Sequence, residues 1–368
     1  MSSVSAHLVR RGVELASTHF KEPKTPEDEQ TPGGLVALFM LTILIVAVIV
    51  GSIEYTYGMV VATLAAVEDP NPDIYVRIDG NDDPTKPFDP NDPEPAAAPS
   101  PKPITSKLRT TIKHLRSRAG FWSRFRGFSM FMAWNMARGF ISAIIPVSSG
   151  SFLGQFFVQS IVSVLLCTWQ MAWVHIVITE PSPKRFYQRI PSWRSWMKIA
   201  PAALLEDVLA AGAFFLPLAI TKLAGTSMFT TPIGADNGMK DLCRLFAFTT
   251  LPAILALILT IPARVIFIRV AASMLPEEEE TIVPFDRSFG GKVQPAILGG
   301  SGKIGLLEAW STFEWASRVR LVKIIGKTFA MQLAVGFLAG IVLGIQLFIM
   351  MPKNSGQGNG SAGTPAVE

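Results

Sequence analysis

The sequence is poor in the residues from which enzymes build reactive centres. Only two cysteines, Cys167 and Cys243, and four histidines occur among 368 residues. Their number and spacing predict neither a disulfide framework nor a metal site. No Ser/His/Asp arrangement and no nucleotide-binding motif accompanies them. We therefore expect no enzyme activity, no metal and no cofactor.

Two loop motifs could hold a ligand only if their spacing were different. Residues 277–280 are four consecutive glutamates, which lack the alternating ligands and the glycine of a calcium loop, so a solvated face is the better interpretation. The stretch from Asp286 to Lys292 contains Gly290 and Gly291 but misses the Gly-x4-Gly-Lys spacing of a phosphate loop. We expect a turn there.

Charge is nearly absent from several long apolar stretches. Mean hydropathy is +0.36 and only 17% of the residues are charged, which argues against a soluble protein. Residues 34–53 carry no charge over about 20 positions, enough to cross a hydrocarbon core of about 30 Å. Six segments are candidate membrane spans: 35–58, 128–147, 152–178, 200–221, 245–272 and 329–350.

The basic residues gather in three of the five loops. The loops after the first, third and fifth segments hold 22 of the 33 Lys and Arg residues. Because basic loops stay on the side from which a membrane protein inserts, this asymmetry predicts six spans with both tails on the far side. The segment 128–147 contains Arg138 and could instead lie in the interface. A five-span chain would separate the termini and remove the asymmetry.

Polar segments surround the spans and cannot bury a core. They are the N-terminal tail (1–33), a Pro- and acid-rich insertion (68–103) and a Gly/Ser-rich C-terminal tail (352–368). Residues 1–30 lack the apolar core of a cleavable signal peptide, so the first span is expected to act as its own insertion signal. Residues 104–126 interleave basic and apolar side chains and predict an amphipathic helix on the membrane surface.

The chain also repeats itself weakly. The first, third and fifth spans end in similar phrases around Thr63, His175 and Arg269, each followed by a proline six or seven residues later. A Trp-rich phrase precedes each even-numbered span: WSRFRGF (122–128), WRSWMKIAP (193–201) and WSTFEW (310–315). This pattern predicts an all-α bundle with a loose three-fold repeat of two spans plus a surface helix. The alternative is that helix ends generally carry Pro and Trp.

At these phrases the pattern resembles the mitochondrial carrier family, whose three repeats each hold two spans joined by a short surface helix. That family ends its odd spans with Pro-x-Asp/Glu-x-x-Lys/Arg. Here only IPARVIFIRV (261–270) comes near, with Pro262 and Arg269. Arg264 stands where the family has its acid, and the first and third spans lack both Pro and acid. The resemblance implies transport, while the missing acids remove the family's salt-bridge gate.

A narrower resemblance covers residues 168–327. The phrases EPSPKR, IPSW, LPEEEETIVPFDRSFGGKV and LLEAW are similar to an uncharacterised fungal family of multi-pass membrane proteins, some of which carry the label of a ubiquitin-conjugating or ubiquitin carrier protein. The residues do not support that label, because conjugation needs an activated, accessible thiolate. Cys167 is expected inside the bundle, and Cys243 has no neighbouring histidine.

Ionisable residues inside the spans are the best functional candidates. A charge at membrane depth costs at least about 2.5–3.5 kcal/mol, so it normally faces a partner, water or the bundle interior. Adjacent helical residues point about 100° apart, so Glu206 and Asp207 are expected to face different neighbours, with Arg138 and Arg264 as partners. His175 and Arg269 could instead extend to the interface. The candidates are Arg138, His175, Glu206, Asp207, Arg264 and Arg269.

A small-residue ridge runs along the last span at Gly336, Gly340 and Gly344. Such a ridge lets another helix approach closely, either within the monomer or in a dimer.

Two functional hypotheses follow from these features. One is a degenerate carrier-type transporter of a small or amphiphilic solute. The other is a non-transporting membrane scaffold or insertion factor that presents its basic loops to partners. Both expect the lipid bilayer and anionic headgroups as partners and no nucleic acid. The carrier resemblance alone favours a mitochondrial or other internal membrane.

The charge asymmetry makes a prediction about topology. Tags at the two termini should report the same compartment, and a tag near residue 90 should report the opposite one, in a protease-protection assay. Termini on different sides would refute six spans and make 128–147 an interfacial helix.

Overall fold

The computed structural model describes residues 33–69, 103–145, 152–223, 238–294 and 299–350. This part of the chain is all-helical, as predicted, and contains no strand beyond a single bridge between Thr179 and Thr281. The longer helices are α2 (Gly33–Ile53), α5 (Leu108–Ala119), α6 (Phe128–Ile144), α7 (Phe152–Leu165), α8 (Cys167–Ile178), α9 (Trp193–Leu223), α10 (Gly238–Ser273) and α12 (Trp315–Met350).

Short helical turns complete the chain. The π-helical turn η1 (Glu54–Val61) and α3 (Ala62–Val67) continue α2 without a break. The connections carry η2 (Ile104–Ser106), η3 (Phe121–Phe125), η4 (Phe186–Arg189) and α11 (Leu306–Ser311). The surface helices of the proposed repeats are therefore unequal, since α5 has 12 residues and η4 has four. The three-fold repeat remains a prediction.

Two helices in the described residues are long and apolar enough to cross a membrane: the continuous helix Gly33–Val67 and α12. A third span is added if α7 and α8, which are bent by 55° at Leu166, count as one. This finding is compatible with an integral membrane protein. Helices also cover the other segments that were predicted to span the membrane. The presence of these helices does not establish six spans.

The described residues divide into two compact units. One holds the outer parts of α2 and α12, up to Gly51 and from Gln332. There the Gln346 side-chain amide donates to the Thr42 hydroxyl over 2.9 Å. Side chains built at Gly336, Gly340 and Gly344 would meet no atom within 4 Å. The ridge therefore packs against no helix in the described structure, and its dimer role stays a prediction.

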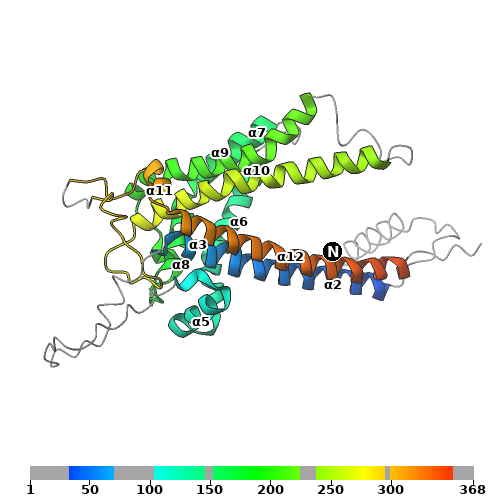
Figure 1. The fold of residues 1–368 in the computed structure, drawn as a ribbon, viewed down its shortest axis with the longest axis horizontal. Helices are drawn as coiled ribbons and strands as arrows, with labels where there is room; N and C mark the ends of the chain where they lie inside the picture. Colours follow the sequence, from blue (N-terminus) through cyan, green and yellow to red (C-terminus); the bar gives the residue numbers. More distant parts are fainter. Residues whose placement is uncertain (1–32, 70–102, 146–151, 224–237, 295–298, 351–368) are drawn as a thin grey trace, which may run out of the picture. The chain divides into compact units, whose positions relative to one another are not determined.

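The second unit, Ser52–Met331, contains the core. In it α9 lies along α10, and α7 packs on α9 (Figure 1). The C-terminal ends of α3, α8 and α10 meet one another. Arg269 on α10 donates to the Ala66 carbonyl over 3.2 Å, and a ring nitrogen of His175 lies 2.8 Å from the Ala271 carbonyl. The three helix ends around Thr63, His175 and Arg269 are thus brought together.

The loops that follow these three helices join into one folded layer, which we call the cap. It comprises residues 68–69, 103–127, 179–192, 274–294 and 299–314. Backbone hydrogen bonds link its segments, from Glu180 N to Glu280 O (2.8 Å), Ile282 N to Ile178 O (2.9 Å) and Asp69 N to Pro284 O (3.0 Å). The cap therefore holds parts of all three basic loops on one side of the bundle.

Helix α5 packs into the cap through its apolar stripe. Leu115 and Thr111 are completely buried, and a ring nitrogen of His114 lies 2.9 Å from the Ile282 carbonyl. The apolar stripe of α5 is thus used for packing within the protein. Its charged residues, Arg109, Lys113, Arg116 and Arg118, are exposed. Phe121 and Trp122, at the end of the segment 104–126, are exposed, and the predicted position of this segment at the membrane surface stays a prediction.

A buried carboxylate, Glu68, ties the cap to α12. Its side chain is fully buried and accepts hydrogen bonds from the Ile104 and Thr105 backbone and from the Thr105 hydroxyl. The Arg320 guanidinium lies 3.6 Å from the carboxylate and also donates to the Glu68 carbonyl over 3.2 Å. Such a buried charge is stable only because every partner is in place.

Removing this carboxylate should loosen the cap. We expect Glu68→Ala to lower the free energy of unfolding by about 3–5 kcal/mol, because it leaves Arg320 and two backbone N–H groups without their acceptor. Thermal unfolding in detergent would measure the change, with the exposed Glu314→Ala as the matched control. Equal melting temperatures for the two variants would contradict this role of Glu68.

Candidate functional site

Two ion pairs connect the helices of the bundle. Arg138 on α6 lies 3.2 Å from Asp207 on α9, and it donates to the Gln159 side chain on α7 from Nε and Nη2 over 3.2 and 3.1 Å. The second carboxylate oxygen of Asp207 accepts from the Ser160 hydroxyl over 2.8 Å. Asp207 is buried, and Arg138 is about one-third exposed. Three helices are fixed to one another by this group.

The neighbouring Glu206 faces the other way. It accepts from the Gln170 amide on α8 over 2.8 Å, and the Arg264 guanidinium on α10 lies 3.7 Å from its other oxygen. Arg264 also approaches the Met59 sulfur to 3.0 Å and lies over the Trp173 ring. Adjacent helical residues diverge by about 100°, which is why the two acids of α9 reach different helices.

The four charges therefore neutralise one another in two pairs. Charges in an apolar bundle persist when they are paired and their remaining lone pairs and protons are satisfied. The structure meets this condition for Asp207 through Ser160 and for Glu206 through Gln170. Such a group can hold helices in register, and it can also act as a relay if water reaches it.

His175 and Arg269 lie at the cap end of the bundle, away from these pairs along α8 and α10. Both are at least nine-tenths buried and bonded to backbone carbonyls, so neither extends to the interface. The Arg269 guanidinium also donates to the Thr312 hydroxyl over 2.9 Å and lies over the rings of Phe289 and Phe313. These two residues close the bundle at the cap.

Sequence reasoning missed the polar residues that complete the pairs. Gln159, Ser160 and Gln170 lie in the apolar segment 152–178, where an uncharged polar side chain is itself a signal. Glu68 and Arg189 carried no such signal, because both fall in loops rich in charge.

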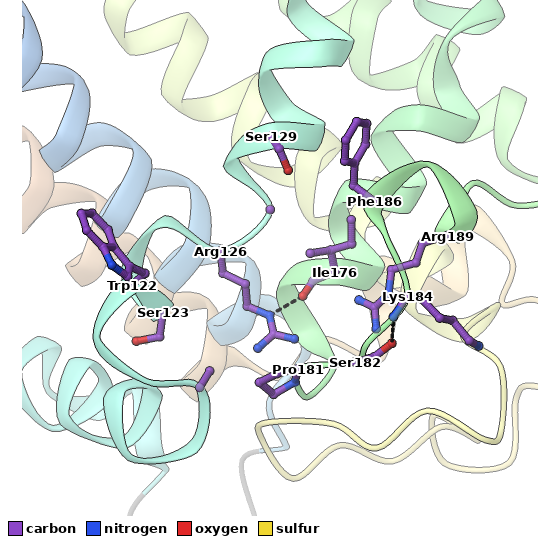
Figure 2. Close-up of a pocket in the computed structure, with 12 residues that line it drawn as sticks. Trp122, Ser123, Arg126, Ser129, Ile176, Pro181, Ser182, Lys184, Phe186 and Arg189 are labelled. Atoms are coloured by element: carbon purple, nitrogen blue, oxygen red, sulfur yellow. Dashed lines mark hydrogen bonds between the residues drawn. The ribbon is translucent and has the colours of Figure 1, made fainter.

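Three cavities open at the cap, and none has Arg138, Glu206, Asp207 or Arg264 in its lining. One, of about 280 Å³, lies between the ends of α8 and α10 and the loop before α9. Another, of about 330 Å³, lies between η2 and α12 beside Arg320, Lys323 and Lys327. The third, of about 290 Å³, is shown in Figure 2. The residues that matter most in it are Trp122, Arg126, Ser182, Lys184, Phe186 and Arg189.

The third cavity is built where α6 begins. Gly127 has φ of 72°, a left-handed conformation suited to glycine, and a side chain there would meet Trp173 at 3.2 Å. The glycine thus lets the chain turn closely over α8. It places Arg126 so that its guanidinium donates to the Ile176 carbonyl.

The structure describes the side chain of one of the two cysteines. Cys167 is fully buried, and the side chain of Cys243 falls outside the described residues. The described residues also contain no group of three His, Cys, Asp or Glu that could hold a metal ion.

Comparisons with known proteins assign no family. No protein-family model, curated protein or solved structure matches the chain. The likenesses to the carrier family and to the fungal membrane proteins therefore rest on sequence motifs.

The Arg138–Asp207 pair should behave as a unit in a stability measurement. Asp207→Leu leaves Arg138 without its counter-charge, and we expect it to lower the free energy of unfolding by about 2 kcal/mol. The double variant Arg138→Met, Asp207→Leu removes both charges and should recover most of the loss. Thermal unfolding in detergent would measure both of these variants and the single variant Arg138→Met. If the double variant loses the sum of the two single losses, the two residues are not coupled.

Proposed function

We propose that this chain is a multi-pass integral membrane protein that acts as a scaffold, presenting a basic, folded cap to anionic partners at the membrane surface. The observation that carries the proposal is the orientation of α5. Its apolar stripe is taken up by the protein, with Leu115 at 0% exposure. Its basic side chains are therefore presented outward on a fixed frame.

Exposed aromatic residues support the placement of this cap beside a bilayer. Trp122, Trp193 and Trp315 are 72%, 68% and 75% exposed, and they lie at or just before the starts of α6, α9 and α12. Tryptophan with one apolar and one polar edge concentrates at membrane–water interfaces. With the three rings in that zone, the helices enter the lipid and the cap stands in the aqueous layer.

Anionic lipid headgroups are the partners that fit best. A basic surface near a membrane gains about 1 kcal/mol per Lys or Arg from anionic lipids. The basic residues are spread over the cap and alternate with membrane-anchoring aromatics, a pattern that does not favour nucleic acid. The carrier resemblance favours a mitochondrial or other internal membrane.

A carrier-type transporter is the second candidate, and the paired charges of α6, α9 and α10 favour it. His175 and Arg269 join the cap-side ends of α3, α8 and α10 through bonds to backbone carbonyls. A carrier whose helices meet at one side would have this arrangement. The cavities at the cap do not include the paired charges. The scaffold is preferred here because the basic side chains of α5 are exposed while its apolar stripe is buried.

The scaffold proposal can be tested with lipid enrichment. The full chain would be reconstituted in nanodiscs of neutral and anionic lipid, and the lipids retained after extraction quantified by mass spectrometry. We expect the triple variant Lys113→Gln, Arg116→Gln, Arg118→Gln to lose most of the enrichment in anionic lipid, and added salt to weaken the enrichment of the unaltered chain.

A control with the same charge change separates position from net charge. The triple variant Arg185→Gln, Arg194→Gln, Lys292→Gln neutralises three exposed cations outside α5 and should retain most of the enrichment. An equal loss in both triple variants would refute the role of α5. Transport of solute by reconstituted protein, abolished by Glu206→Leu, would favour the carrier.

A further inference from the structure

Arg189 is a buried cation whose hydrogen bonds are largely unfilled. Its side chain is only 6% exposed. One donor, Nη1, reaches the Thr179 hydroxyl over 3.2 Å, whereas Nε and Nη2 are buried without a hydrogen-bond partner. Buried polar groups in folded proteins are nearly always satisfied. Arg269 and Arg320 each have only Nε without a partner, whereas Arg189 has two such nitrogens, and this larger deficit points to a ligand.

The acids around Arg189 do not supply the missing partner. Glu279 is 3.8 Å from Nη2 and is shared with Lys184, whose amine lies 3.9 Å away. Glu180 is engaged by Arg118 at 3.2 Å. One carboxylate at long range thus faces two cations.

The cavity of Figure 2 is lined by three positively charged side chains. Arg126, Lys184 and Arg189 line it, no acid does, and the serines Ser123, Ser129 and Ser182 add hydroxyl groups. In the figure the guanidinium groups of Arg126 and Arg189 both point toward the turn at Pro181 and Ser182. Burial and, to a smaller extent, the charge of Arg189 lower the pKa of Arg126 to about 10, while Glu180 and Glu279 oppose the shift.

We propose that this cavity, which Arg189 lines together with Arg126 and Lys184, is a binding site for a phosphate-bearing anion. Three cations and several hydroxyl donors from different directions suit a tetrahedral oxyanion with more than one charge better than a single carboxylate. The volume of about 290 Å³ leaves room for part of the molecule that carries the phosphate. The site does not depend on whether the protein is a scaffold or a carrier.

The phosphate could belong to a soluble molecule or to a lipid headgroup, and the test separates these sources. The full chain in neutral detergent would be titrated with inorganic phosphate at constant ionic strength, with thermal unfolding as the readout. A parallel titration would use mixed micelles containing phosphatidic acid. Stabilisation by inorganic phosphate indicates a soluble ligand, and stabilisation by phosphatidic acid alone indicates a lipid.

Whichever ligand stabilises the protein, Arg189→Gln should raise by about tenfold the ligand concentration that gives half of the maximal thermal stabilisation. This is the effect of losing hydrogen bonds to a charged group. Arg185→Gln is the matched control, because it removes a cation from the same loop without touching the cavity lining. It should leave the response unchanged. If neither titration depends on Arg189, or if the control loses as much, the proposal is overturned.

A second variant guards against a fold defect in Arg189→Gln. Ser182→Asp introduces a carboxylate into the cavity next to the unfilled donors and leaves every cation in place. It should raise the melting temperature in phosphate-free buffer and remove the response to phosphate, whereas Ser182→Asn should do neither. A full phosphate response in Ser182→Asp would place the anion elsewhere and overturn the proposal.

Discussion

Charge buried in an apolar bundle must be neutralised where it lies, and the arrangement of this protein follows from that constraint. Asp207 is held by Arg138 and Ser160, and Glu206 by Arg264 and Gln170. Because these two acids are adjacent on α9, their pairs tie that helix to α6 and α7 on one side and to α8 and α10 on the other. Pairing of this kind contributes specificity more than stability, since an unpaired member is heavily penalised.

The same constraint shapes the cap, where polar groups are buried by loops instead of lipid. Glu68 accepts hydrogen bonds from two backbone N–H groups and one hydroxyl, and it pairs with Arg320. Arg269 donates to a backbone carbonyl at the C-terminal end of α3. These contacts bring the ends of α3, α8 and α10 together, and the basic loops come with them. A surface assembled in this way can present cations at fixed positions. Among the cations that the preceding sections describe at the cap, Arg189 has two buried nitrogens without a hydrogen-bond partner, whereas Arg269 and Arg320 each have one.

The sequence was sufficient for the helical class and for the pairing of Glu206 and Asp207 with Arg264 and Arg138. Long charge-free stretches leave few alternatives to helices, and two acids beside two arginines in such stretches leave few alternatives to pairing. The sequence was insufficient to predict how the loops pack against one another. The stripe of α5 has the same pattern whether it enters lipid or packs on Ile282, and only tertiary contacts decide this. Arg189 could not be found from the sequence, because burial of a loop arginine depends on three segments far apart in the chain.

The central claim is that the loops after α3, α8 and α10 form one cap on one side of the membrane. Single cysteines at Ser117, Lys184 and Ser288 would sample the three loops, in a chain whose Cys167 and Cys243 are replaced by serine. Labelling by a membrane-impermeant thiol reagent on sealed, oriented vesicles is the most direct measurement. The account predicts that all three positions react from the same side. Labelling of any one of them only from the opposite side would contradict it.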